Sequence, residues 1–320
     1  MTLSWIARSA RVALPFLSLG CLTGVAAKAV PAEAGPELFA PEALKASGRI
    51  TLTPGFTPDG RTMYFAQSDC IPIWECPQRL KASTRTANGW SKPIIVDLPQ
   101  DARVDYPSVT PDGRFLLFSW AAKREIYQGR DADSTNFDLW RLDLSRPDAT
   151  PEPIDGPDLN RLRAGEVATL RFVNNETAPV MTEAGNLYFW SERLDGLGDR
   201  DIYVALNDGR GGLKAPMPLP APVNTAGRDD GAWVTPDGRT MLMTSSDRGG
   251  CGGSDLFVTR KTDEGWREPQ NLGCHINSEA DDYAGTLIPG TSRLVFASTR
   301  MAEGLRPGTV ALWSVAVDLD

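Results

Sequence analysis

The chain has 320 residues, of which 41% are hydrophobic and 23% are charged, a composition typical of globular proteins. It excludes an intrinsically disordered chain and a fibrous repeat, and the length suffices for one large all-β domain. Acidic residues outnumber basic ones by 41 to 33, which gives a net charge of −8, and no cluster of Lys and Arg is present. Because nucleic-acid binding depends on such clusters, we expect no nucleic-acid partner.

Residues 1–29 are typical of a secretory signal peptide. Arg8 and Arg11 form a basic start, an apolar run follows, and small residues suited to cleavage come next. The run contains Pro15 and is short for a membrane span, which needs about 20 apolar residues, although an uncleaved anchor is one alternative. A lipoprotein modified at Cys21 is another, but Ser18 stands where a lipobox prefers Leu. We therefore predict a periplasmic or secreted protein whose mature chain has no membrane span.

A repeated unit fills the mature chain. Each unit has an apolar strand, a tight turn with the sequence TPDGR and a second apolar strand. Pro fixes φ at the first corner of such a turn, Asp accepts a local backbone hydrogen bond, and Gly adopts the left-handed conformation. Two units depart from the pattern, with the turns TEAGN from Thr182 and IPGTS from Ile288, but both keep the glycine. The turn glycines are 53, 72, 53 and 52 residues apart, at Gly60, Gly113, Gly185, Gly238 and Gly290.

A third strand and a short fourth segment follow each pair, and four strands in about 50 residues are the signature of a propeller blade. We therefore expect residues 30–320 to form an all-β, single β-propeller with five blades of four antiparallel strands. A sixth blade between residues 151 and 172 is the alternative. The fifth unit lacks a fourth strand of its own, so an N-terminal strand near residues 36–39 should close the ring and cover two exposed edges.

The residues that carry the repeat resemble a known family. The segment WVTPDGRTMLMTSSDRGGCGGSDLFVTRKTDEGWREPQNLGCHINSEADD, residues 233–282, is similar to a WD40-like repeat of the TolB type. The resemblance covers roughly residues 37–320. It implies a β-propeller that acts as an interaction platform in the cell envelope. The repeat predicts the fold specifically but gives almost no information about function, because propellers have many unrelated activities.

We expect a binding site on the face that carries the longer loops, since variable loops on a rigid scaffold tend to bind ligands. Acidic residues begin the innermost strand of four blades, and three arginines end second strands close by. One interpretation is a ligand site at the channel mouth, and the other is that each carboxylate bonds backbone N–H groups or an arginine. The residues are Asp105, Glu176, Asp230 (or Asp229), Asp282 (or Asp281), Arg193, Arg248 and Arg300.

Four cysteines remain in the mature chain, at Cys70, Cys76, Cys251 and Cys274. An even number in an exported protein favours two disulfides, and the pairings 70–76 and 251–274 are the easiest in this topology. Four free thiols remain the alternative. A zinc site is the competing interpretation, but the chain has no CxxC motif and only one His.

The sequence assigns no catalytic residue, metal or cofactor. His275 is the only His, and neither a GxSxG nor an HExxH motif is present. The leading hypothesis is a binding module of the cell envelope that binds an envelope protein or a glycan. The alternatives are a carbohydrate-active enzyme that uses two channel-mouth carboxylates, and a purely structural partner of another protein.

Overall fold

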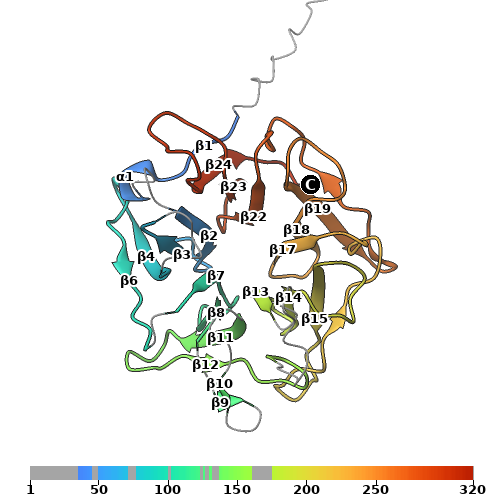
Figure 1. Ribbon diagram of the computed structural model, residues 1–320. Helices are drawn as coiled ribbons and strands as arrows, with labels where there is room; N and C mark the ends of the chain where they lie inside the picture. Colours follow the sequence, from blue (N-terminus) through green and yellow to red (C-terminus); the bar gives the residue numbers. More distant parts are fainter. Residues whose placement is uncertain are drawn as a thin grey trace, which may run out of the picture. The chain divides into compact units, whose positions relative to one another are not determined.

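The computed structural model describes residues 35–44, 50–70, 77–99, 102–122, 125–126, 130–131, 137–160 and 175–319, which belong to one compact unit. Five antiparallel sheets are arranged around a centre as the blades of a propeller, as predicted (Figure 1). Each has a path of four strands, and in two of them a further short strand pairs with the third strand. The predicted signal peptide lies outside the described residues. None of the helices within the described ranges is both long and apolar enough to cross a bilayer.

The strands follow the chain from the innermost to the outermost position of each blade. Blade 1 has β2 (Ile50–Phe56), β3 (Thr62–Ser68), β4 (Arg79–Thr86), β5 (Gly89–Trp90) and β6 (Ile94–Ile95). Blade 2 has β7 (Val104–Val109), β8 (Phe115–Trp120), β11 (Asp138–Asp143) and β12 (Glu152–Pro153), and the hairpin of β9 (Glu125–Ile126) and β10 (Arg130–Asp131) precedes β11. Blade 3 has β13 (Glu176–Met181), β14 (Leu187–Ser191), β15 (Asp201–Ala205) and β16 (Met217–Pro218). Blade 4 has β17 (Asp229–Val234), β18 (Thr240–Ser245), β19 (Asp255–Thr262), β20 (Gly265–Trp266) and β21 (Gln270–Asn271).

Blade 5 is completed by the N-terminal strand, as the sequence predicts. It consists of β22 (Asp282–Leu287), β23 (Arg293–Ser298), β24 (Ala311–Ala316) and β1 (Glu37–Leu38), which pairs with β24. Phe39 then packs against Phe56 and Trp90 of blade 1, with ring centroids 6.3 and 5.9 Å apart. A four-residue helix, α1 (Pro41–Leu44), leads into β2. The first and last blades are therefore joined by hydrogen bonds and by aromatic packing.

The TPDGR turns are held by the residues that define the repeat. In blade 1, the Thr57 hydroxyl and the Arg61 N–H both donate to Asp59, at 2.6 and 3.0 Å. Gly60 has a φ of 66°, a conformation that glycine adopts without a steric penalty. The turns of blades 2 and 4 repeat the same two hydrogen bonds. We define the face that carries these turns as the turn face and the opposite one as the loop face.

Each innermost strand contains a β-bulge at the same place, and this bulge shapes the centre of the ring. Tyr106, Ala178 and Ala284 have φ values of 51°, 61° and 54° at the bulge, where side chains are uncommon. Their N–H groups donate to side chains of the preceding blade, such as Thr53 for Tyr106, at 3.0 Å, and Ser119 for Ala178, at 2.9 Å. At each of these bulges, an N–H group therefore forms a hydrogen bond to the neighbouring blade in place of one to the next strand of its own sheet.

Candidate functional site

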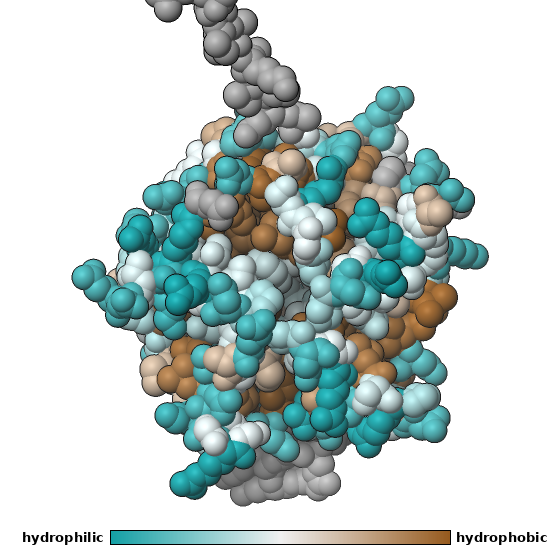
Figure 2. Space-filling model, turned by 180° about the vertical axis from the view of Figure 1, so that it is seen from behind, coloured by the Kyte–Doolittle hydropathy of each residue, from teal (hydrophilic) through white to brown (hydrophobic). Residues whose placement is uncertain are grey.

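A funnel opens at the centre of the turn face. It has a volume of about 280 Å³ and is lined by residues of all five innermost strands and of the turns that follow them. Towards the loop face it continues into a much smaller neck of about 30 Å³, which shares Ser108, Trp233 and Thr286 with the funnel wall. The space-filling view shows a central hollow bordered by pale residues of intermediate hydropathy (Figure 2).

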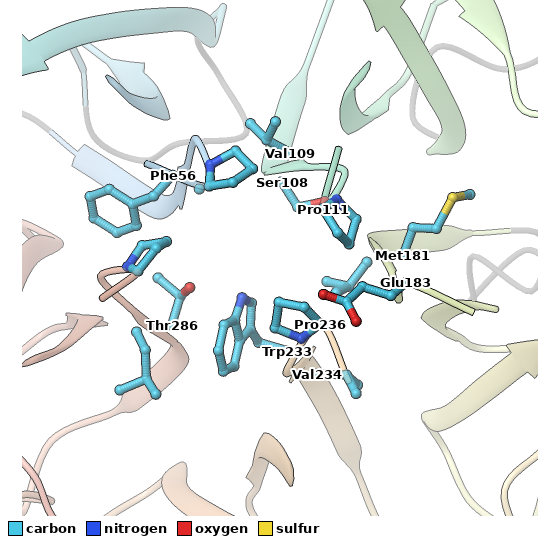
Figure 3. Close-up of a pocket in the computed structure, with 15 residues that line it drawn as sticks. Phe56, Ser108, Val109, Pro111, Met181, Glu183, Trp233, Val234, Pro236 and Thr286 are labelled. Atoms are coloured by element: carbon cyan, nitrogen blue, oxygen red, sulfur yellow. The ribbon is translucent and has the colours of Figure 1, made fainter. Parts of the chain in front are cut away.

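The repeat builds the funnel wall in layers. The outer layer consists of the prolines of four turns and, in blade 3, of Glu183. These residues occupy equivalent places in the repeat, at Pro58, Pro111, Glu183, Pro236 and Pro289. Below them, Trp233 and Thr286 lie at the inner end, and Phe56 contributes an aromatic ring to the wall (Figure 3). Among the fifteen lining residues, Glu183 is the only one with a charged side chain.

Glu183 results from the altered turn TEAGN. Its N–H donates to the carbonyl oxygen of Pro236 in the next blade, at 2.8 Å, a bond that proline cannot form. Its exposed carboxylate is directed towards the interior of the funnel (Figure 3). The TEAGN turn is visible in the sequence as a departure from the repeat, but the sequence alone gives Glu183 no function. The signal that could have identified the funnel was therefore a charged residue at a position where the other four blades have proline.

The acids at the starts of the innermost strands fall into two sets. In the first set, three carboxylates form buried ion pairs with the predicted arginines: Glu176 with Arg193, Asp229 with Arg248 at 3.0 Å, and Asp282 with Arg300 at 2.5 Å. Both side chains of the Glu176–Arg193 pair are almost fully buried, with exposed fractions of 0% and 1%. In blade 4 the partner of Arg248 is thus Asp229 and not the neighbouring Asp230.

These ion pairs also hold the connections between blades. Arg193 donates to the carbonyl oxygen of Asp158 at 2.7 Å, and Arg300 donates to that of Ile276 at 2.6 Å. On the other side of the pair, Asp282 accepts hydrogen bonds from the N–H and hydroxyl groups of Ser278, at 2.6 and 2.7 Å. Glu176 and Asp282 therefore have their acceptor sites occupied by groups of the fold, which is the arrangement expected of a structural role.

Asp105 and Asp230 form the second set. Asp230 accepts a hydrogen bond from Arg200 at 2.8 Å, and the Arg200 guanidinium also lies 4.7 Å from the centre of the Trp190 ring. Asp105 accepts from the Thr53 hydroxyl at 2.8 Å and from its neighbour's N–H at 2.7 Å. Burial raises the pKa of Asp105 to about 6. Both lie outside the buried arginine pairs, as does Asp281, the alternative to Asp282, which accepts a hydrogen bond from the N–H of Ser254 at 3.0 Å.

Two tyrosines lie close to this second set. Burial raises the pKa of Tyr283, and the charges of Asp105, Asp281 and Asp230 raise it further. Tyr106 lies at the neck, and its pKa is raised by burial and then by the charge of Asp230. Both hydroxyls therefore stay protonated and can donate hydrogen bonds at neutral pH. No group of three or more metal-binding side chains occurs among the described residues.

One predicted disulfide is present between two loops of blade 4. Cys251 and Cys274 are bonded, with Cα atoms 5.4 Å apart and a sequence separation of 23. Cys70 is also disulfide-bonded, and Cys76, its predicted partner, lies outside the described residues. The Cys251–Cys274 bond links the β18–β19 connection to the segment that leads into blade 5.

No protein-family model matches this sequence, and no curated protein matches it. Among solved structures, the chain is similar to an α-L-arabinofuranosidase from Lactobacillus brevis, with a TM-score of 0.52 and 14% identity over 83% of this chain and 90% of that one. It is also similar to TolB from Acinetobacter baumannii, with a TM-score of 0.44 and 14% identity over 82% of this chain. The match covers 54% of the TolB chain, about half of its length. At 14% identity the similarity to the arabinofuranosidase is one of fold alone and shows no shared activity.

Proposed function

We propose that the protein is an exported binding module of the cell envelope, and that the funnel receives a protruding segment of a partner protein. The observation that carries the proposal is the chemistry of the funnel wall. Prolines, Phe56 and Trp233 supply apolar surface, Ser108 and Thr286 supply hydroxyls, and Glu183 supplies the single charge. Apolar walls with a few placed polar groups are typical of binding sites.

The size and rigidity of the funnel favour part of a large partner over a whole small ligand. Its volume of about 280 Å³ is at the lower end of the range of small-molecule pockets, about 300–1,000 Å³. The wall stands on turns that are fixed by internal hydrogen bonds, so little ordering is needed on binding. A chain end or a side chain of a partner protein would fit such a site.

Export is supported by two independent features. The predicted signal peptide over residues 1–29 directs the chain out of the cytoplasm. The Cys251–Cys274 bond is of the kind that persists in oxidising compartments such as the periplasm. The role in the envelope and the identity of the partner remain part of this proposal.

The carbohydrate-active alternative has less support. Glycoside hydrolysis needs two carboxyl groups that can reach the substrate on either side of the scissile bond. Glu176 and Asp282 are buried in ion pairs, and Asp230 is engaged by Arg200. Asp105, whose pKa is raised to about 6, remains as a candidate acid without an equivalent partner carboxylate. A ligand at the loop-face mouth stays a prediction that rests on Asp105 and Asp230.

A peptide library tests the proposed function. Linear peptides displayed on phage would be selected on the mature protein, and the selected peptides would then be measured by calorimetry on two variants. Trp233→Ala removes part of the funnel wall, whereas Trp266→Ala removes a half-buried tryptophan of the same blade that packs against Tyr188, outside the funnel. We expect binding to be lost in the first variant and retained in the second. Peptides that bind the Trp233→Ala protein with unchanged affinity would refute the proposal.

A further inference from the structure

Glu183 differs from every other acid in the TPDGR-like turns. Asp59, Asp112 and Asp237 each accept a hydrogen bond from a threonine hydroxyl of their own turn, which lowers the pKa of each carboxyl. In blade 3, Ala184 occupies the place of this aspartate, and the carboxylate has moved to the position of the preceding proline. Blade 3 thus lacks the aspartate that stabilises the turn in blades 1, 2 and 4, and it has instead a glutamate, Glu183, that faces the funnel.

The turn of blade 3 keeps its shape without that aspartate. The Asn207 side chain donates to the carbonyl oxygen of Ala184 at 2.9 Å, and the N–H of Gly185 donates to that of Thr182 at 2.9 Å. The N–H of Glu183 is fixed to Pro236. Among the described residues, the carboxylate of Glu183 has neither a hydrogen bond nor an ion pair. The main chain of this residue is therefore held rigidly while its charged group is available to a ligand.

The surroundings favour a positively charged partner. Prolines form the outer layer of the wall together with Glu183, and Coulomb attraction is stronger beside such apolar groups than in bulk water. Trp233 lines the same funnel at its inner end, and a tryptophan ring also attracts cations, so it adds a second favourable interaction for a positively charged segment. The whole chain carries a net charge of −8, which attracts cationic segments over longer distances.

We propose that the funnel recognises a single cationic group of the partner segment, either a Lys or Arg side chain or a free amino terminus, through the carboxylate of Glu183. The inference rests on the proposed function, because it concerns the same funnel. The neck of about 30 Å³ beside Trp233 and Tyr106 is much smaller than the funnel, and the carboxylate of Glu183 belongs to the outer layer of the funnel wall. A cationic group on a protruding chain can therefore meet the carboxylate without the chain passing through the ring.

The test uses peptides selected from the phage library on the wild-type protein, resynthesised in three forms. One form is unchanged, one has norleucine in place of Lys or Arg, and one has an acetylated amino terminus. Each is titrated into the wild-type protein, into Glu183→Gln and into Glu264→Gln. Gln retains the N–H that bonds Pro236. Glu264 is an exposed acid of the turn between β19 and β20, so its substitution changes the net charge equally outside the funnel.

We expect Glu183→Gln to weaken the unchanged peptide about tenfold, the range of one charge-assisted hydrogen bond, and Glu264→Gln to leave it unchanged. One of the two altered peptides should bind the wild-type protein about tenfold more weakly than the unchanged peptide, and it should bind Glu183→Gln no more weakly than it binds the wild type. If this is the norleucine form, the cationic group is the side chain; if it is the acetylated form, the cationic group is the amino terminus. Equal affinity of all forms for the wild-type and Glu183→Gln proteins, with binding still lost in Trp233→Ala, would overturn this inference and leave the proposed function standing. Unchanged binding in Trp233→Ala would overturn both.

Discussion

Replacing Asp105 by Asn should stabilise the protein at neutral pH and lose this effect in acid. Asp105 is buried, and its pKa is raised to about 6 mainly by that burial. A carboxyl group whose pKa is higher in the folded than in the unfolded chain favours folding in its protonated form. Its contribution is complete below pH 4 and is lost as the pH rises through about 6. At pH 7.5 the wild-type protein therefore carries the cost of a buried charge that Asn does not have.

The magnitude follows from the shift. A pKa that rises from 3.8 to about 6 corresponds to about 3 kcal/mol, at about 1.4 kcal/mol per pKa unit. Asn can accept the same hydrogen bonds through its Oδ1 atom, from the Thr53 hydroxyl and from the N–H of Tyr106. The charge of Arg103 opposes the shift, and the pKa of about 6 already includes its attraction to the carboxylate, which Asn lacks.

The assay is urea unfolding of both proteins between pH 4 and pH 8, followed by tryptophan fluorescence. The variant should be more stable by about 3 kcal/mol above pH 7, and the two curves should converge towards pH 4. Asp230→Asn is the control with the opposite sign, because it removes a carboxylate from Arg200 and should destabilise the protein. A pH-independent difference between Asp105→Asn and wild type, or a less stable variant at pH 7.5, would refute the reasoning.

Three further predictions concern the links between elements. Replacing Cys251 and Cys274 by Ser should lower the free energy of unfolding by about 3 kcal/mol, since the bond joins residues 23 apart in sequence; urea unfolding of the variant and of the oxidised wild type measures the difference. Arg248→Met should cost about 3 kcal/mol or more by leaving Asp229 charged and buried, and adding Asp229→Asn should recover much of that loss in a double-mutant cycle. Phe39→Ala should cost about 3 kcal/mol and make the N-terminal segment more sensitive to limited proteolysis, because the ring packs against blade 1; an unchanged cleavage rate would contradict this role.

The fold could be predicted from the sequence because the propeller is built from local units. The TPDGR turn is specified by a Pro, an Asp and a Gly within five residues. Each copy therefore predicts a hairpin from its local sequence alone. Counting the copies then predicts five blades. The closing strand followed from the same pattern, since only the fifth unit lacked a fourth strand and an unpaired edge is unfavourable.

The site could be predicted only in part, because its residues depend on register. Asp229 and Asp230 are adjacent, and successive side chains of a strand point to opposite faces, so a shift by one residue decides which of them meets Arg248. The bulge that begins directly after Asp230 fixes this register, and Gly231, with a φ of 59°, is its one sign in the sequence GAW. Glu183 was visible as a departure from the repeat. Its orientation towards the funnel depends on the ring closing around it, which the repeat alone does not describe.

The pairing of β1 with β24 also has a kinetic consequence. Glu37 is opposite Ser314 and Leu38 is opposite Trp313, so the contact joins residues from opposite ends of the propeller. Bringing such distant residues together is entropically slow compared with forming the local hairpins of each blade. We expect the blades to form first and the ring to close last. Until closure, β24 exposes a free edge to other chains, so the interval before closure is when this protein is most prone to aggregate.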